Sequence, residues 1–535
     1  TASSTRRAQP AHPTGFDMAA ADPALPFASE GEIEAAYLRS KELFATGETK
    51  PIAWRLKQLQ KLRAMIVKHE ATIESAIVAD MHRADFEAQI FETRPCIAQI
   101  DDTISFITSG SLSRGVSVPL ALGTASARVE MVPKGAVLII GAWNYPAALT
   151  LGPLVDVLGA GNTAVIKPSE LSPRSASVIG RLLEETFTDG EVLVLHGAVK
   201  ETTQILKLRW DHIVYTGSSP VGRIVMSAAA KHLTPVTLEL GGKCPVIVDA
   251  TADMTVACRR IAQARFANAG QTCLAADYVL VERPVADAFI RTMKKTVREF
   301  YTDSPQSSPD FGRVVNQRHT RRIASLIEEA RSLGGTVVVG GESDIEDCYI
   351  APTVMTDVPL DTTLQREETF GPVLLVQPVD SVDEALERVN AGEKPLALYV
   401  FSSDSSTIAK VEKGTLSGSL AINDALMQRG IVSAPFGGVG ESGMGSYSAG
   451  HGVREFSHHR TVFSNPTLLD IPLRYPPYSG FTKGLIGSLV GTSLPPLSWR
   501  QVAVPLGIGV LLFALFYTGY FKGDRLARIQ DAFSF

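Results

Sequence analysis

The chain has 535 residues and carries 51 basic and 56 acidic side chains, for a formal net charge of −5 at pH 7. This length is too great for one hydrophobic core and predicts two or three domains, while the near-neutral charge without a basic stripe argues against nucleic acid as a partner. The five cysteines lack CxxC spacing, which argues against a disulfide framework and a zinc site; we expect a reducing compartment and no bound metal.

The N-terminal part begins with a polar, proline-rich stretch. Residues 1–28 predict a disordered lead, with an arginine-containing transit peptide as the weaker alternative. A helix should begin after Ser29, because Ser29 and Glu32 have capping-box spacing, and a second helix should follow Pro51.

The segments that follow alternate between strand-like and helix-like patterns. The β-branched runs AVLII, GNTAVIKP and DHIVYTG alternate with helical stretches such as ALTLGPLVDVLGAG, which is typical of parallel βαβ units. We therefore expect a doubly wound α/β nucleotide-binding fold. Residues 113–132 break this rhythm and predict an inserted hairpin.

Two short motifs supply a nucleophile and a base. GQTC ends at Cys273, and LELGGK contains Glu239, with glycines beside both reactive side chains. A cysteine that attacks a substrate needs little bulk around it and a group that activates water, so this pair fits nucleophilic catalysis. The alternatives are a cysteine that packs as a small hydrophobe and a carboxylate that is purely structural. Flanking leucines would desolvate Glu239 and raise its pKa, which suits a general base.

Other motifs fit the binding of a dinucleotide. YTGSSPVGRIV joins a strand to a helix through Gly217, Ser218 and Gly222, where a helix N-terminus favours a pyrophosphate. Taken alone, this turn would more often be a connector. Lys167 and Glu170 in KPSE follow another strand and could equally be solvated charges.

These motifs, with GAWNYP at residues 141–146 and EETFGPV at 367–373, resemble the aldehyde dehydrogenase superfamily over residues 30–465 and, near the C-terminus, its class 3 branch with the microsomal fatty aldehyde dehydrogenases. Glu441 and the run SAGHG depart from that pattern. The resemblance implies a covalent thioester on the nucleophile, an oxyanion held by an asparagine, a water-activating glutamate, and NAD as cofactor, with NADP as the alternative. The residues concerned are Cys273, Asn144 and Glu239 for catalysis, and Trp143, Lys167, Glu170, Gly217, Ser218, Gly222, Glu368 and Phe370 for the cofactor.

The resemblance also implies a domain plan: a Rossmann-like NAD domain, an α/β catalytic domain, a small β oligomerisation element and a homodimer. The expected ranges are 29–112 with 132–237 for the NAD domain, 238–429 for the catalytic domain, and 113–131 with 430–465 for the oligomerisation element. Residues 466–500 are expected to form a linker with a short helix, which in the microsomal relatives caps the aldehyde funnel of the partner subunit; a helix lying on lipid is the alternative.

A long apolar segment lies near the C-terminus. Residues 501–521 carry no charge, and twenty helical residues rise about 30 Å, the thickness of a bilayer core. This predicts a single transmembrane anchor followed by a tail, 522–535, with a buried core helix as the alternative. We expect the catalytic part in the cytosol on an intracellular membrane, the endoplasmic reticulum first, although Lys522, Arg525 and Arg528 would favour a cytoplasmic tail.

The sequence thus predicts NAD-dependent oxidation of long-chain apolar aldehydes, such as fatty aldehydes, to carboxylic acids by a membrane-anchored enzyme. Apocarotenals or other isoprenoid aldehydes are the second choice of substrate. Two hypotheses from other classes are a catalytically silent membrane scaffold on the same fold and an esterase that uses only the thiol.

Overall fold

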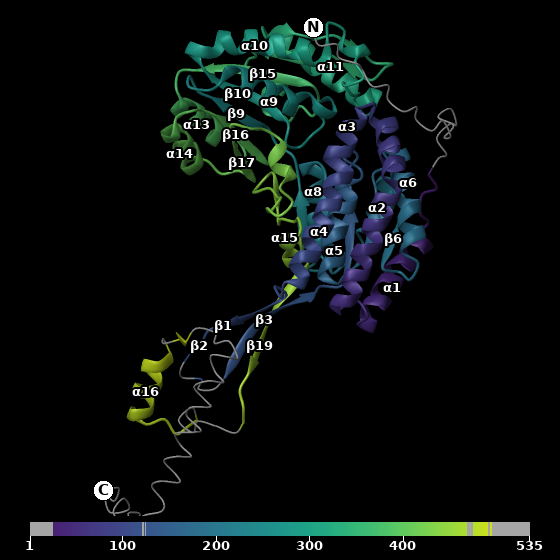
Figure 1. Ribbon diagram of the computed structural model, residues 1–535, viewed down its shortest axis with the longest axis vertical. Coiled ribbons are helices and arrows are strands. Elements are labelled where there is room, and N and C mark those ends of the chain that lie inside the picture. The colour runs from purple at the N-terminus through teal and green to yellow at the C-terminus, as the bar shows by residue number, and fades with distance from the viewer. Residues whose placement is uncertain (1–24, 120–121, 123–124, 468–474, 491–492, 495–535) are drawn as a thin grey trace, which may run out of the picture. The chain divides into compact units, whose positions relative to one another are not determined.

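The structure, a computed structural model, describes residues 25–119, 122, 125–467, 475–490 and 493–494. The chain divides into two compact units, which are described separately: Thr1–Ser109 with Pro133–Ser457, and Gly110–Val132 with His458–Phe535. The first unit contains two large sheets with helices packed around them (Figure 1).

One of these sheets has six strands in the order β18-β8-β7-β4-β5-β6. All neighbours are parallel except β18, which is antiparallel to β8. The three central strands are buried along their whole length, as a parallel sheet covered on both faces requires. The predicted doubly wound fold is confirmed. The strands are β4 (Ala136–Ile140), β5 (Thr163–Lys167), β6 (Val192–Val194), β7 (His212–Thr216), β8 (Val236–Glu239) and β18 (Gly443–Met444).

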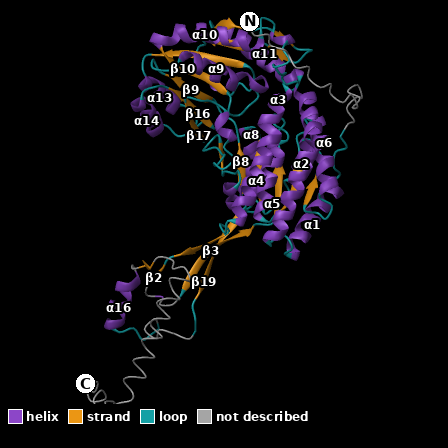
Figure 2. Cartoon of the chain, in the orientation of Figure 1, coloured by secondary structure: helices purple, strands orange, loops and turns teal. Residues whose placement is uncertain are grey.

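The first two helices begin where the sequence predicts, after Ser29 and after Pro51. Ser29 Oγ accepts a hydrogen bond from the Glu32 N–H at 3.3 Å, and Glu32 Oε2 accepts one from the Ser29 N–H at 2.8 Å, so the capping box is confirmed. The helices are coloured purple in Figure 2. They are α1 (Glu30–Thr46), α2 (Ile52–Met81), α3 (Asp85–Ala88), the π-helix η1 (Gln89–Thr93), α4 (Arg94–Thr108), α5 (Ala148–Ala160), α6 (Pro173–Thr186), α7 (Val199–Ile205) and α8 (Ser219–Ala230).

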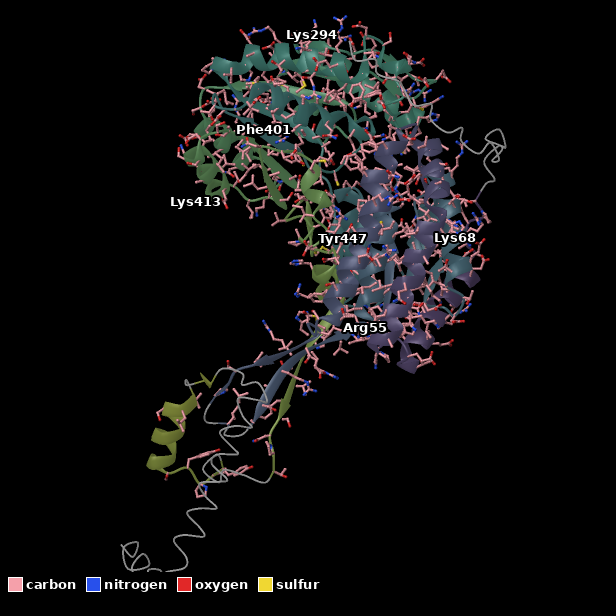
Figure 3. All side chains as sticks on the ribbon, viewed as in Figure 1. Arg55, Lys68, Lys294, Phe401, Lys413 and Tyr447 are labelled. Atoms are coloured by element: carbon pink, nitrogen blue, oxygen red, sulfur yellow. The ribbon has the colours of Figure 1, made fainter. Side chains whose placement is uncertain are left out.

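The other large sheet has seven strands in the order β11-β14-β15-β10-β9-β16-β17, parallel except for β11 against β14. Phe401 of β16 lies in its core, whereas Lys294 of α10 is exposed (Figure 3). The strands are β9 (Cys244–Val248), β10 (Ala276–Glu282), β11 (Thr336–Val339), β14 (Thr353–Thr356), β15 (Val373–Val379), β16 (Ala397–Phe401) and β17 (Ser419–Ile422). The main helices are α9 (Met254–Phe266), α10 (Arg283–Tyr301), α11 (Gln317–Ser332), α13 (Val382–Ala391), α14 (Ser405–Gly414) and, near the six-stranded sheet, α15 (Gly450–Glu455).

The chain passes from one sheet to the other through the LELGGK motif. β8 of the six-stranded sheet ends at Glu239, and β9 of the seven-stranded sheet begins at Cys244. β10, which follows the GQTC motif, lies beside β9, with Ala276 opposite Cys244. The chain therefore places both predicted reactive motifs where it passes between the sheets: Glu239 at the end of β8, and GQTC just before β10, the neighbour of β9.

The second unit contains the predicted hairpin. β1 (Ser113–Val116) pairs antiparallel with β3 (Ser126–Pro133), and β19 (Ser457–Ser464) completes a sheet of order β1-β3-β19. A small antiparallel pair joins β2 (Val118–Pro119) to β20 (Ser493–Leu494), and α16 (Gly480–Val490) is the predicted short helix. Because β18 and α15 pack in the first unit, only the end of the predicted range 430–465 belongs to the second.

Within the described residues, no helix has both the length and the apolar character needed to cross a bilayer. The predicted anchor, 501–521, lies outside those residues, as do most of the predicted lead and the tail.

Candidate active site

Cys273 lies in the loop between the 3-10 helix η3 (Ala267–Gly270) and β10, and its side chain is partly exposed. The loop is fixed on two sides. Tyr145 Oη and Thr272 Oγ1 are hydrogen-bonded at 2.6 Å, and the Cys244 thiol donates to the Cys273 carbonyl at 3.3 Å. Cys244 is fully buried, so it both packs under the nucleophile loop and holds it.

The turn before the nucleophile has an unusual backbone. Asn268, Ala269 and Gly270 all have positive φ, at 51°, 50° and 73°. For alanine this conformation is strained, and such strain persists only where the surroundings impose it. Here the Asn268 N–H donates to Glu87 Oε2 at 2.9 Å, and a Cβ on Gly270 would collide with the Gly371 carbonyl. The GQTC and FGPV motifs therefore pack directly together.

Asn144 is buried in the loop after β4 and is bonded to the nucleophile loop. Its side-chain Nδ2 donates to the Gln271 carbonyl at 3.0 Å, and its own carbonyl accepts from Asn268 Nδ2 at 2.9 Å. An amide group has two N–H donors, and one of them is used by Gln271. Within the described residues the other has no acceptor, so it can donate to an oxygen atom of a ligand.

A buried ion pair supports this asparagine. Arg83 and Glu92 are fully buried and bonded to each other. Glu92 Oε2 also accepts the N–H groups of Ala147 and Ala148, at 2.7 and 3.2 Å, at the start of α5. The Arg83 guanidinium lies over the Tyr145 ring at 4.9 Å and donates to the Asn144 carbonyl at 3.4 Å. Sequence reasoning missed this pair, because no motif surrounds either residue.

Glu239 is buried at the end of β8, and neither carboxyl oxygen has a hydrogen-bond partner in the part of the chain that the structure describes. Burial raises the pKa of Glu239 well above its usual range; the nearby Arg429 lowers it, and Glu455 raises it further. Buried polar groups without partners are rare in native proteins. A carboxyl group without a partner can engage a water molecule when one enters.

The thiol and Glu239 influence each other electrostatically. Burial, and then the carboxyl groups of Glu368 and Glu239, raise the pKa of Cys273 to about 12, while Arg429 opposes this rise. The thiol is therefore protonated in the resting protein, and a base must remove its proton before it attacks. The structure thus brings Cys273, Asn144 and Glu239 into one site.

Glu368 and Phe370 lie on a tightly held loop beside this site. Burial, and then Asp277, raise the pKa of Glu368 to about 8, while a hydrogen bond from the Gly242 N–H lowers it. Phe370 has a φ of 46°, and its ring meets the edge of Trp143 with 5.3 Å between ring centres. Trp143 and Phe370, which are both expected to bind the cofactor, are therefore in contact.

Asp277, which sequence reasoning missed, anchors that loop. It accepts the Thr369 hydroxyl at 2.8 Å and the Thr369 N–H at 3.2 Å, and it pairs with Lys243 at 3.2 Å and Arg265 at 3.6 Å. Its only signal in the sequence is an acid near the start of a mostly apolar strand.

The predicted dinucleotide residues lie at the ends of β5 and β7. Lys167 is buried and bonds Glu170 Oε2 at 3.1 Å and the Gly197 carbonyl at 2.9 Å. Ser218 precedes α8 without making a side-chain cap, which leaves the helix N–H groups available.

The turn at α8 fits a pyrophosphate. A Cβ on Gly217 would strike the Tyr215 hydroxyl, and one on Gly222 would come within 2.8 Å of Leu240 Cδ2. Thr216 Oγ1 is buried without a partner within the described residues, at the last position of β7. An open helix N-terminus, close glycine packing and an unpaired hydroxyl are the features that a phosphate group would complete.

The thiol lines a pocket whose volume is about 770 Å³ when the open solvent at its mouth is included. Its walls come mainly from η1, α4, α5 and the segment 426–436, and most of the side chains are apolar. They are Ile90, Phe91, Pro95, Cys96, Gln99, Tyr145, Ala148, Leu149, Thr272, Cys273, Leu274, Leu426, Met427, Arg429, Gly430 and Phe436. A thiol at the wall of an apolar pocket suits a substrate with a reactive polar end and a hydrocarbon body.

Comparison with known proteins agrees with this geometry. The sequence pattern of the aldehyde dehydrogenase family matches residues 23–462. Aldehyde dehydrogenase family 3 member A2 of Pongo abelii is 43% identical over 448 residues, covering 82% of this chain and 90% of that protein. The 4,4'-diaponeurosporen-aldehyde dehydrogenase of Staphylococcus aureus is 41% identical, covering 84% and 97%.

A solved structure is similar over the same region. The substrate-bound state of Staphylococcus aureus AldH has a TM-score of 0.83 and 40% identity, and the match covers 85% of this chain and 99% of that one. The fold, the convergence of the thiol, amide and carboxyl groups, and the match over most of the chain lead to one conclusion. The chain belongs to the aldehyde dehydrogenase family and is an NAD(P)-dependent oxidoreductase of aldehydes.

Proposed function

We propose that the protein oxidises long-chain apolar aldehydes, such as fatty aldehydes, to carboxylic acids with NAD, as a homodimer anchored in an intracellular membrane. The observation that carries the substrate class is the pocket in front of Cys273, whose lining is apolar except at a few positions. Each methylene group moved from water into such a lining is worth about 0.8 kcal/mol, so affinity should rise with chain length.

The proposed reaction uses three groups of the chain. The partly exposed Cys273 thiol gives its proton to solvent water, and the thiolate attacks the carbonyl carbon. The unused N–H of Asn144 and the backbone N–H of Cys273 would hold the oxygen as charge develops on it. When bound, a nicotinamide ring would accept the hydrogen of that carbon together with its bonding electron pair. The resulting acyl group is a thioester on Cys273.

Glu239 completes the cycle. Its unpaired carboxylate, once ionised, takes a proton from a water molecule, and the water oxygen attacks the thioester carbon. The acid leaves and the thiol is restored. A buried acid whose oxygens have no partner in the described structure serves this step better than a structural role, which argues against the inactive scaffold.

The cofactor is proposed to lie along the residues described above. Gly217, Ser218 and Gly222 would hold the pyrophosphate, Lys167 and Glu170 the adenosine ribose, and Glu368, Phe370 and Trp143 the nicotinamide side. This is a proposal from the resemblance, supported by the unpaired Thr216 hydroxyl and the uncapped start of α8.

An isoprenoid aldehyde is the second candidate substrate. The relative named 4,4'-diaponeurosporen-aldehyde dehydrogenase favours it, and an apolar pocket accepts such a chain as well as a saturated one.

One set of rate measurements tests both the substrate class and the membrane anchor. NADH formation is measured for short and long aldehydes, saturated and isoprenoid, with and without liposomes, for the full chain and for a chain that ends at Pro496. Long aldehydes should give the higher kcat/KM, and liposomes should raise it further for the full chain only, because a tethered enzyme meets bilayer-dissolved substrate at high local concentration. Equal rates for all lengths would refute the substrate class, and an equal liposome gain for both chains would refute the anchor.

A separate prediction concerns Glu170. NAD should be preferred over NADP, since a carboxylate at the ribose repels a 2′-phosphate. Glu170→Gln should reduce the ratio of kcat/KM for NAD over NADP by about tenfold, equivalent to about 1.4 kcal/mol. Glu185→Gln, which removes an exposed partner of Arg181 on α6, is the matched control and should leave the ratio unchanged. A wild-type preference for NADP would contradict the assignment.

A further inference from the structure

A line of polar side chains lies behind Glu239 and takes no part in the proposed reaction. Lys134 Nζ lies 3.1 Å from His212 Nδ1, and His212 Nε2 lies 2.8 Å from Thr237 Oγ1. The Thr237 hydroxyl donates to Glu455 Oε1 at 2.8 Å. His212 and Thr237 are buried, whereas Lys134 and Glu455 are half-buried. We call these four residues the polar chain.

The hydrogen bonds of the polar chain all run in one direction. A lysine ammonium only donates, so His212 Nδ1 accepts from Lys134, and a neutral ring then carries its proton on Nε2. Burial, and then Lys134, hold the pKa of His212 well below its usual range, so the ring is neutral. Nε2 therefore donates to Thr237, whose single hydroxyl proton goes to Glu455. The polar chain thus presents a donor that fixes the position of the Glu455 carboxylate.

Strand β8 connects this contact to the proposed base. Side chains alternate between the two faces of a strand. Leu238 and Leu240 pack in the apolar core on one face, so Thr237 and Glu239 lie on the other, about 7 Å apart along the strand. The Glu455 carboxylate, which is bonded to Thr237, is therefore held on the same face as Glu239.

A glycine leaves room for this carboxylate. β18 pairs with the end of β8, with Gly443 opposite Glu239. A Cβ on Gly445, which follows β18, would lie 2.6 Å from Glu455 Oε1 and 3.1 Å from Thr237 Oγ1. A larger residue at this position would displace the carboxylate, so the backbone itself permits the close approach of Glu455 to β8.

Two opposite charges face the buried Glu239. Burial raises the pKa of Glu239, Arg429 lowers it and Glu455 raises it. The other titratable groups that interact with Glu239 are Cys273 and Tyr447 (Figure 3), and both are uncharged because burial raises their pKa. Glu455 is therefore the charge that opposes Arg429 at this carboxyl group.

We propose that Glu455 is a positioning residue for the hydrolysis step: the polar chain holds its carboxylate beside Glu239 as a fixed negative charge, which makes Glu239 a stronger base toward water. Arg429 alone would stabilise the Glu239 anion and weaken it as a base. A stronger base takes the water proton more readily but ionises at a higher pH. This inference rests on the proposed function, because it assigns Glu455 an effect on the base of that reaction.

The ionisation of Glu239 can be measured without turnover. A protonated carboxyl group has an infrared C=O band, and the part of this band that is missing in Glu239→Gln belongs to Glu239. The loss of this band is followed from acidic to alkaline pH in the full-length wild type and in Glu455→Gln. The pH at which half of the band is lost should fall by about one unit in Glu455→Gln, as expected for removing a like charge about 7 Å away.

Thioester hydrolysis gives a second readout. In Glu455→Gln, the thioester formed from hexanal should be hydrolysed faster than in wild type at acidic pH, where more Glu239 is ionised. At alkaline pH its hydrolysis should be slower by about threefold, because the weaker base limits the step. The two pH profiles should therefore cross. A uniform fall at every pH would mean that Glu455 only holds the fold together, and would overturn the proposal.

Other variants separate charge from structure. Thr237→Val removes the bond that holds Glu455 and should lower the infrared midpoint, whereas Thr237→Ser keeps the hydroxyl and should not. If Glu455→Gln does not fold, Glu455→Asp serves instead, since it draws the charge back and should lower the midpoint by a smaller amount. Glu384→Gln is the matched control and should leave the midpoint unchanged. Glu384 on α13 is also half-buried, accepts the Asp380 N–H at 2.7 Å and pairs with Arg388.

The infrared measurement needs no substrate, so it tests Glu455 independently of the proposed function. No turnover of any aldehyde by the wild type would refute the proposed function itself. An infrared midpoint that does not move in Glu455→Gln would overturn the role of Glu455 alone.

Discussion

Glu239→Gln should give an enzyme that reduces about one equivalent of NAD per active site and then stops. The electron pair leaves the carbon before water is needed, so loss of the base blocks only the second half of the cycle. The trapped thioester on Cys273 should be visible by intact mass, and its hydrolysis should be slower than in wild type by about 100- to 10,000-fold, the usual contribution of general base catalysis. Steady turnover in this variant would remove Glu239 from the mechanism.

The role of Cys273 as nucleophile can be tested by replacing it and a second cysteine, Cys258, with alanine. Cys273→Ala should show neither the initial release of NADH nor a covalent adduct, because no thiol remains to form the thioester. Cys258 is the control: it is buried in α9, its thiol donates to the Phe289 carbonyl at 3.6 Å, and it lies outside the pocket. Cys258→Ala should therefore keep normal turnover. Activity in Cys273→Ala would identify a different nucleophile.

The raised pKa of Glu239 also predicts a pH dependence with a definite sign. Hydrolysis needs the ionised carboxylate, so its rate should rise with pH until Glu239 ionises and fall as pH drops below that point. The contribution of Glu239 to the stability of the folded protein should change with pH in the opposite sense. Above the ordinary pKa of 4.5, the folded chain retains a proton that the unfolded chain has lost, so the free energy of unfolding falls as pH rises. Glu239→Gln should remove this loss, which makes the variant more stable at neutral pH and less active.

The motifs on single segments could be predicted from the sequence. The capping box of α1, the buried strands β4, β5 and β7, and the β1–β3 hairpin depend on residues close together in the chain, and all are confirmed. The contact between the GAWNYP and GQTC motifs could not be predicted from a local pattern, since Asn144 and Gln271 are far apart in the sequence. It could be expected only from the family resemblance.

Other features of the site could not be predicted. The left-handed turn at Asn268 and Ala269 exists because Glu87 and Gly371 hold it from outside the motif. Asp277 joins the Thr369 loop through side-chain bonds whose partners follow no local pattern. The bond from Cys244 to the Cys273 carbonyl depends on β9 lying beside β10. Such contacts depend on sheet order and side-chain placement, which spacing along one chain does not determine.

Glu92→Gln should lower both stability and kcat, because Glu92 holds the buried Arg83 and the start of α5 at the same time. Breaking a buried ion pair leaves an unpaired charge and costs about 3–5 kcal/mol. Urea unfolding should show this loss. Asp101→Asn is the control, since it breaks the exposed pair with Arg63 on the neighbouring helix and should change little.

The effect on kcat tests whether Glu92 and Arg83 position Asn144, beyond stabilising the fold. Both act on the loop from Asn144 to Ala148: Arg83 bonds the Asn144 carbonyl, and Glu92 caps the helix that follows. If the pair aims the Asn144 amide at the substrate oxygen, Glu92→Gln should reduce kcat by about tenfold or more in the folded enzyme with little change in KM. In a double-mutant cycle with Asn144→Ala, the two losses should be far from additive, because the second change removes a group that the first has already misplaced. Arg83→Met with Glu92→Gln removes both charges and should recover stability without recovering kcat. Additive losses, or a kcat that returns with stability, would mean that the ion pair only holds the fold together.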